Sequence, residues 1–226
     1  MMERQTSFIT KWVYGMIRNS LIWLFFNLPI GYLVLNLLLA ENFNEFATLM
    51  TTIYVLIPFV FSPGTVVALD CTRRFYREGS AYPLWKTAWK SYRKNWLISM
   101  KQGLIFCGGI FVLLAASRFY GQYFGGAGQM IPYFAMGILS LLFLFVLAYT
   151  ADREETLVDY WKKSGLLIIN HFLLFVFMSL EVLLTIYFTH FFSFLLIFVA
   201  PGLVLLFVMH FYLETVKSEA FRDLKS

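Results

Sequence analysis

Six long apolar stretches, separated by short polar segments, dominate the pattern of hydrophobic and polar positions along the chain. Each stretch is close to the roughly 20 residues that a helix needs to cross about 30 Å of hydrocarbon. The pattern therefore predicts an all-α, polytopic membrane protein with a single integral membrane domain over residues 1–226. The six predicted transmembrane helices cover about 20–39, 48–69, 96–117, 131–150, 165–188 and 192–213.

The polar connection between the second and third spans contains a segment with helical periodicity, at about 81–95. Its aromatic residues recur every three or four positions and so share one helix face, with cations on the adjacent face. Rings at headgroup level and snorkelling Lys or Arg side chains suit a membrane surface. We therefore expect a cytoplasmic interfacial amphipathic helix that contacts the anionic inner leaflet, a partner protein, or both. The residues expected to contact lipid or partner are Arg73, Arg74, Arg77, Trp85, Lys86, Trp89, Lys90, Tyr92, Arg93, Lys94 and Trp96.

Composition and charge distribution agree with this topology. The chain is 60% hydrophobic and only 14% charged, against roughly 25% charged in soluble domains. Its net charge of +5 is not gathered on a soluble face, so we expect no nucleic-acid partner. Of the 18 Lys and Arg residues, all but Arg118 fall on one predicted side. By the positive-inside rule, both termini are expected in the cytoplasm of a multi-pass cell-membrane protein.

Prolines and glycines interrupt several spans. In the second span they predict a kink near 58–64, where Ser62 or Thr65 is placed to satisfy a freed carbonyl. Another interruption is expected mid-way through the sixth span. We interpret these as packing kinks; the alternative is a transporter site built from broken spans, although the interruptions do not correspond between two three-helix repeats. The helix-breaking residues are Pro58, Pro63, Gly64, Pro201 and Gly202.

Intramembrane titratable groups are few. Glu181 follows Ser164 by about 17 residues, which places it about 25 Å along a straight helix, near the outer boundary of the fifth span. At this depth we interpret it as an interfacial or hydrogen-bonded carboxyl, with proton coupling as the alternative. We interpret the scattered histidines as packing or interface residues: His171, His190 and His210.

Motifs that carry catalysis are absent from the sequence. Neither HExxH, GxSxG, GxGxxG nor a Walker A pattern occurs, and these are the spacings that hydrolases, dinucleotide enzymes and ATPases require. Cys71 and Cys107 lie near the reducing side and within a span, so we expect no disulfide. We therefore predict that the protein is not an enzyme and has no catalytic residue, metal or cofactor.

The segment SPGTVVALDCTRRFYREGSAYPLWKTAWKSYRKNWLISMKQGL resembles the signature of the YesL-like proteins, small bacterial integral membrane proteins with a domain of unknown function. Asn19, Trp23 and the later WKKSGLLIINHFLL and FVAPGLVLLF are similar in kind. Members are often encoded beside carbohydrate ABC importers. The resemblance implies an accessory or scaffold subunit of oligosaccharide or polysaccharide uptake, with importer permease subunits as partners. An autonomous small-solute transporter or channel is the alternative.

Overall fold

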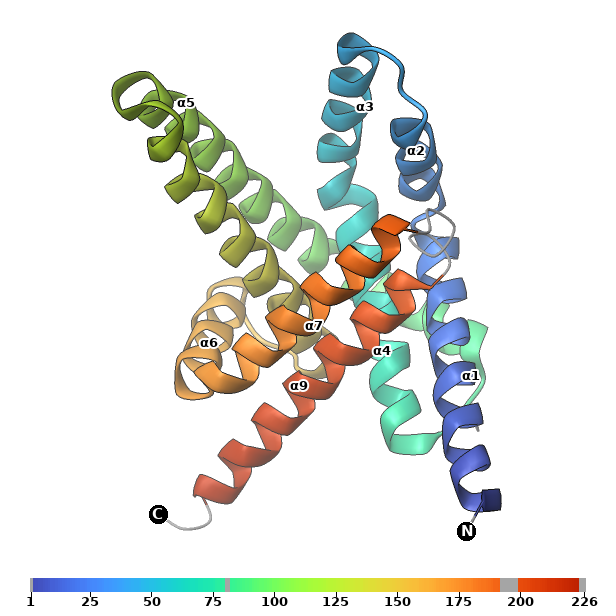
Figure 1. Ribbon diagram of the computed structural model, residues 1–226. Helices are drawn as coiled ribbons and strands as arrows, with labels where there is room; N and C mark the ends of the chain where they lie inside the picture. Colours follow the sequence, from blue (N-terminus) through green and yellow to red (C-terminus); the bar gives the residue numbers. More distant parts are fainter. Residues whose placement is uncertain (1, 80–81, 192–198, 224–226) are drawn as a thin grey trace.

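The computed structural model describes residues 2–79, 82–191 and 199–223, and every regular element in these ranges is helical (Figure 1). The predicted all-α class is therefore confirmed. The elements are α1 (Met2–Phe26), α2 (Leu28–Leu38), α3 (Phe43–Leu56), the π-helix η1 (Ile57–Phe61), α4 (Ser62–Glu78), α5 (Leu84–Asp152), α6 (Leu157–Asn170), α7 (Phe172–Phe191) and α9 (Ala200–Asp223).

Several helices have the length and apolar character of a membrane crossing. Three continuous stretches qualify by themselves: Phe43–Glu78, Leu84–Asp152 and Ala200–Glu219. Two further pairs qualify only if each sharply bent pair is one span: Trp12–Phe26 with Leu28–Leu38 at 92°, and Leu157–Asn170 with Phe172–Thr185 at 99°. The described residues therefore contain three to five candidate spans, compatible with a membrane protein.

α5 is a helical hairpin rather than one straight helix (Figure 1). The chain reverses at Gly125, whose φ of 65° and ψ of −158° are open to glycine and strained for other residues. The two arms then lie side by side, with Gln102 Nε2 donating to Thr150 Oγ1 at 2.7 Å. The rings of Phe106 and Phe143 stack between the arms at a centroid distance of 4.2 Å. Gly125 is the one described residue of α5 with a non-helical backbone conformation, so the reversal is made at this residue.

The interfacial helix predicted at 81–95 is not a separate element. α5 begins at Leu84 and remains helical through Trp96 and beyond, while residue 81 lies outside the described residues. The sequence has neither glycine nor proline from Leu84 to Gln102, so nothing interrupts backbone hydrogen bonding between the amphipathic segment and the apolar one. The basic, aromatic segment therefore forms the first turns of a longer helix.

The fifth predicted span is not straight. α6 and α7 meet at 99°, with His171 at the break in a non-helical conformation. Glu181 lies about 15 Å beyond this break, at about 1.5 Å per residue, so its placement about 25 Å along a straight helix was wrong. It lies close enough to His210 of α9 for electrostatic interaction. The side chain of His190 lies outside the described residues.

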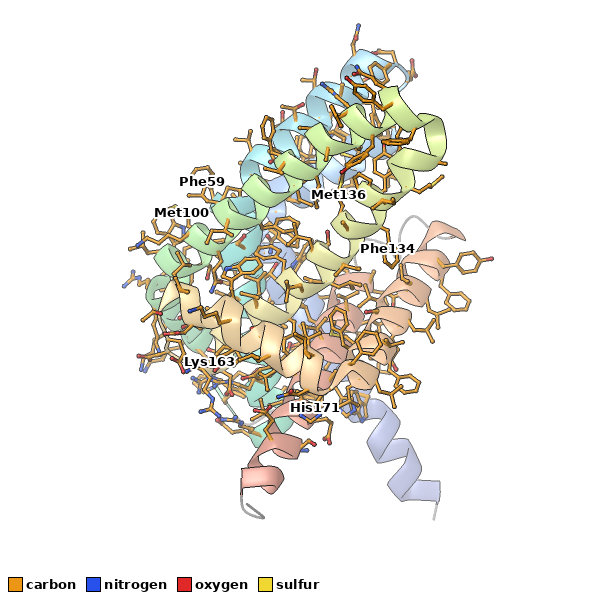
Figure 2. All side chains as sticks on the ribbon, turned by 90° about the vertical axis from the view of Figure 1, so that its left-hand side faces the viewer. Phe59, Met100, Phe134, Met136, Lys163 and His171 are labelled. Atoms are coloured by element: carbon orange, nitrogen blue, oxygen red, sulfur yellow. The ribbon has the colours of Figure 1, made fainter. Side chains whose placement is uncertain are left out.

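Helices α1, α4, α5 and α9 enclose the core. All residues of α4 from Ser62 to Thr72 are buried, and α4 lies between α1 and α5. The start of α1 and the end of α9 lie at one end of the molecule, whereas the α5 turn and the α2–α3 connection diverge at the other (Figure 1). Large apolar side chains on the outside, such as Phe59 and Phe134 (Figure 2), are 45% and 73% exposed.

Candidate functional site

Asp152 is the centre of an ionic network at the end of α5. Its carboxylate accepts hydrogen bonds from Arg73 Nη1 at 2.7 Å, Arg77 Nη2 at 3.0 Å and the Tyr212 hydroxyl at 3.0 Å. The Asp152 side chain is only 5% exposed. A buried carboxylate is stable when paired and hydrogen-bonded, and here α4 supplies the cations and α9 the hydroxyl. The network therefore ties three helices together.

Arg73 connects two acids in this network. Its Nη2 donates to Asp70 Oδ1 at 2.6 Å, while Nη1 holds Asp152. Arg74 lies 3.5 Å from the same Asp70 oxygen and 3.9 Å from Glu78. Both buried acids, Asp70 and Asp152, are therefore already neutralised by guanidinium groups of α4. The end of α4 is thereby fixed against the end of α5 before any ligand is considered.

Residues of this network line a cavity of about 400 Å³. Six Lys and Arg residues and three acids line it, which leaves a net charge of +3. Its volume lies within the roughly 300–1,000 Å³ of typical small-molecule sites. The charged lining residues are Asp70, Arg73, Arg74, Lys86, Lys90, Lys94, Asp152, Arg153 and Glu154, with Pro83, Thr87, Ser91, Asn95, Thr150 and Ala151 between them.

Three lysines form one edge of the cavity. Lys86, Lys90 and Lys94 are spaced four residues apart on α5 and therefore stand one above the other on one helix face. Lys94 pairs with Glu154, and this hydrogen bond and charge lower the pKa of Glu154. Among the described residues, Lys86 and Lys90 form no ion pair within 4 Å. Their charges therefore remain available to a ligand.

The aromatic face of the same helix packs against the end of α1. Trp85 meets Phe25 edge-on at 4.9 Å, and Tyr92 stacks on Phe26 at 5.1 Å. Trp85 nevertheless remains 55% exposed. Arg93 lies over the ring of Trp89, 5.5 Å from its centroid. Trp96 continues the stripe and is 37% exposed.

The helix-breaking residues of the second span lie inside the bundle. Pro58 falls in the π-helix η1, and Ser62 Oγ donates to the Ile57 carbonyl at 2.9 Å. The same carbonyl also accepts the backbone N–H of Ser62, so the hydroxyl adds a second hydrogen bond at the predicted kink. Pro63 and Gly64 begin α4, where a Cβ on Gly64 would lie 2.9 Å from Cγ of Asn27. These residues permit close helix contacts rather than lining the basic cavity.

The interruption predicted in the sixth span has a different setting. α9 begins at Ala200, so Pro201 lies in its first turn, where a missing N–H leaves no helical hydrogen bond unmade. The backbone N–H of Gly202 donates to Ser20 Oγ at 3.1 Å, joining α9 to α1. The preceding residues 192–198 of the predicted span lie outside the described residues.

Of the residues predicted to contact lipid or a partner, the structure brings some together at the cavity and places the others on different helix faces. Arg73, Arg74, Lys86, Lys90 and Lys94 line the cavity, and Arg77 joins the ionic network. The four aromatic residues and Arg93 lie on other faces of α5. These separate faces follow from helical periodicity.

The sequence did not identify Asp70, Asp152 or Tyr212 as members of this network. Asp152 reads as part of a solvated connection, although an acid directly after a long apolar run is a signal for a paired, partly buried carboxylate. Tyr212 gave no sequence signal, because a tyrosine near a membrane boundary usually marks the interface. Among the described residues, no group of three or more His, Cys, Asp or Glu is placed to hold a metal ion. The arrangement suits anion binding by cationic donors.

Comparison with known proteins covers part of the chain. No curated protein and no solved structure matches it. Residues 16–116 match the family described as "Protein of unknown function, DUF624". This match includes the three cavity lysines and the arginines of α4, whereas Asp152 and Tyr212 lie beyond it. The similarity therefore covers residues 16–116, less than half of the chain, and is to a domain of unknown function.

Proposed function

We propose that the protein is a non-enzymatic accessory subunit of a membrane complex, crossing the bilayer six times and contacting its partner through the first turns of α5. The observation that carries this proposal is the pairing of a fixed ionic network with an exposed aromatic and basic helix face. Trp85 and Trp89 are 55% and 48% exposed, although the Arg73–Asp152 ion pair fixes the end of the same helix, α5, against α4. Exposed tryptophan with neighbouring Arg is typical of interface hot spots.

Six crossings are compatible with the candidate spans. The two bent pairs and the two long helices Phe43–Glu78 and Ala200–Glu219 would each supply one crossing. α5 would supply two, because its arms run antiparallel on either side of Gly125. An even number of crossings agrees with the start of α1 and the end of α9 lying at one end of the molecule.

Charge supports the orientation in the cell membrane. The cavity cations lie at the end of α4, at the start of α5 and, for Arg153, directly after the end of α5. Arg118 lies about two helical turns before the Gly125 reversal. The positive-inside rule then makes the cavity end cytoplasmic, together with both termini. Anionic lipids of the inner leaflet would lie beside the same cations.

The proposed partner is a permease subunit of a carbohydrate ABC importer. This identity rests on the resemblance to YesL-like proteins and on no contact within the structure. What the geometry adds is a rigid surface that a partner helix or loop can meet without reordering the chain, which lowers the entropic cost of association.

Site-specific photo-crosslinking tests the partnership. A photoreactive amino acid at Trp89 should crosslink in native membranes to an importer permease, identified by mass spectrometry. Trp85→Ala/Trp89→Ala should abolish co-purification of that permease, whereas Phe111→Ala/Phe119→Ala, which removes exposed rings elsewhere on α5, should retain it. Crosslinks to lipid alone, or equal recovery with both variants, would leave anchoring as the only role of this face.

Cysteine accessibility tests the topology. A single reporter cysteine at Lys90 should react with a membrane-impermeant maleimide only after permeabilisation, and one at Tyr123 should react in intact cells. Labelling of the Lys90 position from outside would contradict the orientation.

A transporter or channel is the second candidate, because helix interruptions meet inside the bundle. α1 and α2 bend by 92° at Asn27, whose Oδ1 is buried without a hydrogen-bond partner among the described residues. Asn27 also packs on Gly64 of the second interrupted stretch. Buried polar groups at broken helices are typical of substrate sites. Solute flux into liposomes containing this chain alone would support this function. Loss of that flux in the Asn27→Leu variant would place the solute pathway at Asn27.

A further inference from the structure

We propose that the 400 Å³ cavity between α4 and α5 is a binding site for a phosphate group carried by a small organic molecule or a lipid headgroup. Lys86 and Lys90 would be its principal ligands, with Arg74 and Arg153 on the facing side. The inference goes beyond the proposed function, since it concerns what occupies the cavity rather than what contacts the aromatic face.

Lysine spacing is the first observation that points to an anion. Like charges four residues apart on a helix repel each other and destabilise the helix. Lys86, Lys90 and Lys94 stack two such pairs on one face of α5, and only Lys94 has an acid within reach among the described residues. An anion held between Lys86 and Lys90 removes this repulsion and provides a charge-assisted hydrogen bond to each.

The acids of the cavity do not neutralise these lysines. Asp70 and Asp152 are held by Arg73, at 2.6 and 2.7 Å. Glu154 is paired with Lys94. Each acid therefore already has a cationic partner, and the net charge of +3 at the cavity stays uncompensated. A ligand that enters meets donors on two helices and on the α5–α6 connection.

Phosphate fits this arrangement better than carboxylate does. A phosphate monoester carries about two negative charges and three terminal oxygens, enough to accept hydrogen bonds from Lys86, Lys90 and an arginine at once. A carboxylate has one charge and two oxygens. The hydroxyl of Thr87, beside the lysines in the lining, offers one further neutral donor.

Cavity size indicates more than inorganic phosphate. A volume of about 400 Å³ is that of a small-molecule pocket. A soluble organic phosphate and the headgroup of an anionic phospholipid both satisfy this size and chemistry. An apolar groove of about 520 Å³ lies beside this turn. It is lined by the exposed rings of Trp85, in the first turn of α5, and of Phe25, at the end of α1.

Matched ligands on the full-length, delipidated protein in detergent test the site. Glycerol 3-phosphate against glycerol, measured by calorimetric titration, tests a soluble phosphate. Dioleoyl phosphatidic acid against dioleoylglycerol, measured by native mass spectrometry, tests a headgroup. Only the phosphorylated member of each pair should bind saturably. Binding of glycerol 3-phosphate indicates a soluble ligand, and binding of phosphatidic acid alone indicates a lipid headgroup.

Charge-matched variants assign binding to the cavity. Lys86→Gln/Lys90→Gln should weaken affinity about 100-fold or more, because two charge-assisted hydrogen bonds are lost and each contributes a factor of about ten or more. Lys101→Gln/Lys162→Gln removes the same charge from exposed positions outside the cavity and should change affinity less than about twofold. Thermal unfolding verifies that both double variants fold. If Lys86→Gln/Lys90→Gln does not fold, the single variant Lys90→Gln takes its place.

Two results would overturn the site. The first is that neither phosphorylated probe binds the wild-type protein. The second is that both double variants lose affinity equally, which would indicate non-specific attraction. Crosslinking at Trp89 is a separate measurement. A crosslinked permease without phosphate binding would refute this site and leave the proposed function standing. Phosphate binding without a crosslinked permease would support this site and refute the proposed function.

Discussion

Arg73 and Asp152, 79 residues apart in the chain, form a 2.7 Å ion pair that joins α4 to the end of α5. Both side chains are largely buried, at 15% and 5% exposure. The pair is completed by Arg77 and Tyr212. Because removal of one partner from a buried pair leaves the other charge uncompensated, this relationship gives direct expectations for stability.

Asp152→Asn should destabilise the protein strongly. The amide keeps the shape of the carboxyl but removes the counter-charge of Arg77 and leaves Arg73 with Asp70 alone. The cost should be about 3 kcal/mol, the lower end for a broken buried pair, because Asp70 still neutralises Arg73. Thermal unfolding of the purified protein in detergent measures the loss. Glu78→Gln is the control, because that acid is 50% exposed and 3.9 Å from Arg74, and such pairs contribute about 0–1 kcal/mol. Equal shifts in unfolding temperature for the two variants would show that Asp152 is not the central residue of the network.

Tyr212→Phe should have a smaller, separable effect. The ring would keep its edge contacts with Phe145 and Tyr149, at 5.6 and 6.0 Å. Only the hydrogen bond to Asp152 is lost, which costs about 1.5–3 kcal/mol for a charged acceptor. Thermal unfolding again measures the loss of stability. The exposed Tyr123, beside the Gly125 reversal of α5, provides the near-neutral control Tyr123→Phe. No difference between the two would mean that water replaces the Tyr212 hydroxyl.

Gly125→Ala should weaken the α5 hairpin. At φ 65° and ψ −158°, a Cβ imposes backbone strain of about 1–3 kcal/mol. Gly108→Ala is matched, because it lies in the same helix with open space around its Cβ position, and alanine is favoured there by about 0.5–1 kcal/mol. Unfolding temperatures should therefore move in opposite directions. A stabilised Gly125→Ala variant would show that the reversal has another conformation.

Gly103→Ala should separate α5 from η1. The added Cβ would lie 2.6 Å from the backbone Cα of Pro58, which cannot rotate away as a side chain does. Overpacking of this kind costs about 1–3 kcal/mol. Gly165→Ala, which meets open space on α6, is the comparison. If a cysteine pair across α5 and η1 crosslinks equally in both variants and unfolding is unchanged, the contact is looser than the distance indicates.

Helical periodicity let the sequence alone describe local features of the site. Positions four residues apart share a helix face whatever surrounds the helix, so the lysine row and the aromatic row could be assigned to adjacent faces. The separate interfacial helix was not found, because helix-forming residues run without interruption from Leu84 through Trp96 into the following apolar segment. The reversal within α5 falls at a glycine, Gly125, because few other residues adopt a positive φ at low cost.

Tertiary structure alone decided which charges meet. The sequence by itself determined a helical chain with long apolar stretches and cations gathered beside them, since composition and periodicity are local properties. The 99° bend that moves Glu181 toward His210, and the pairing of Asp152 with Arg73, Arg77 and Tyr212, depend on contacts between segments far apart in the chain. Such contacts are selected by packing of whole helices against one another, and no local pattern encodes them.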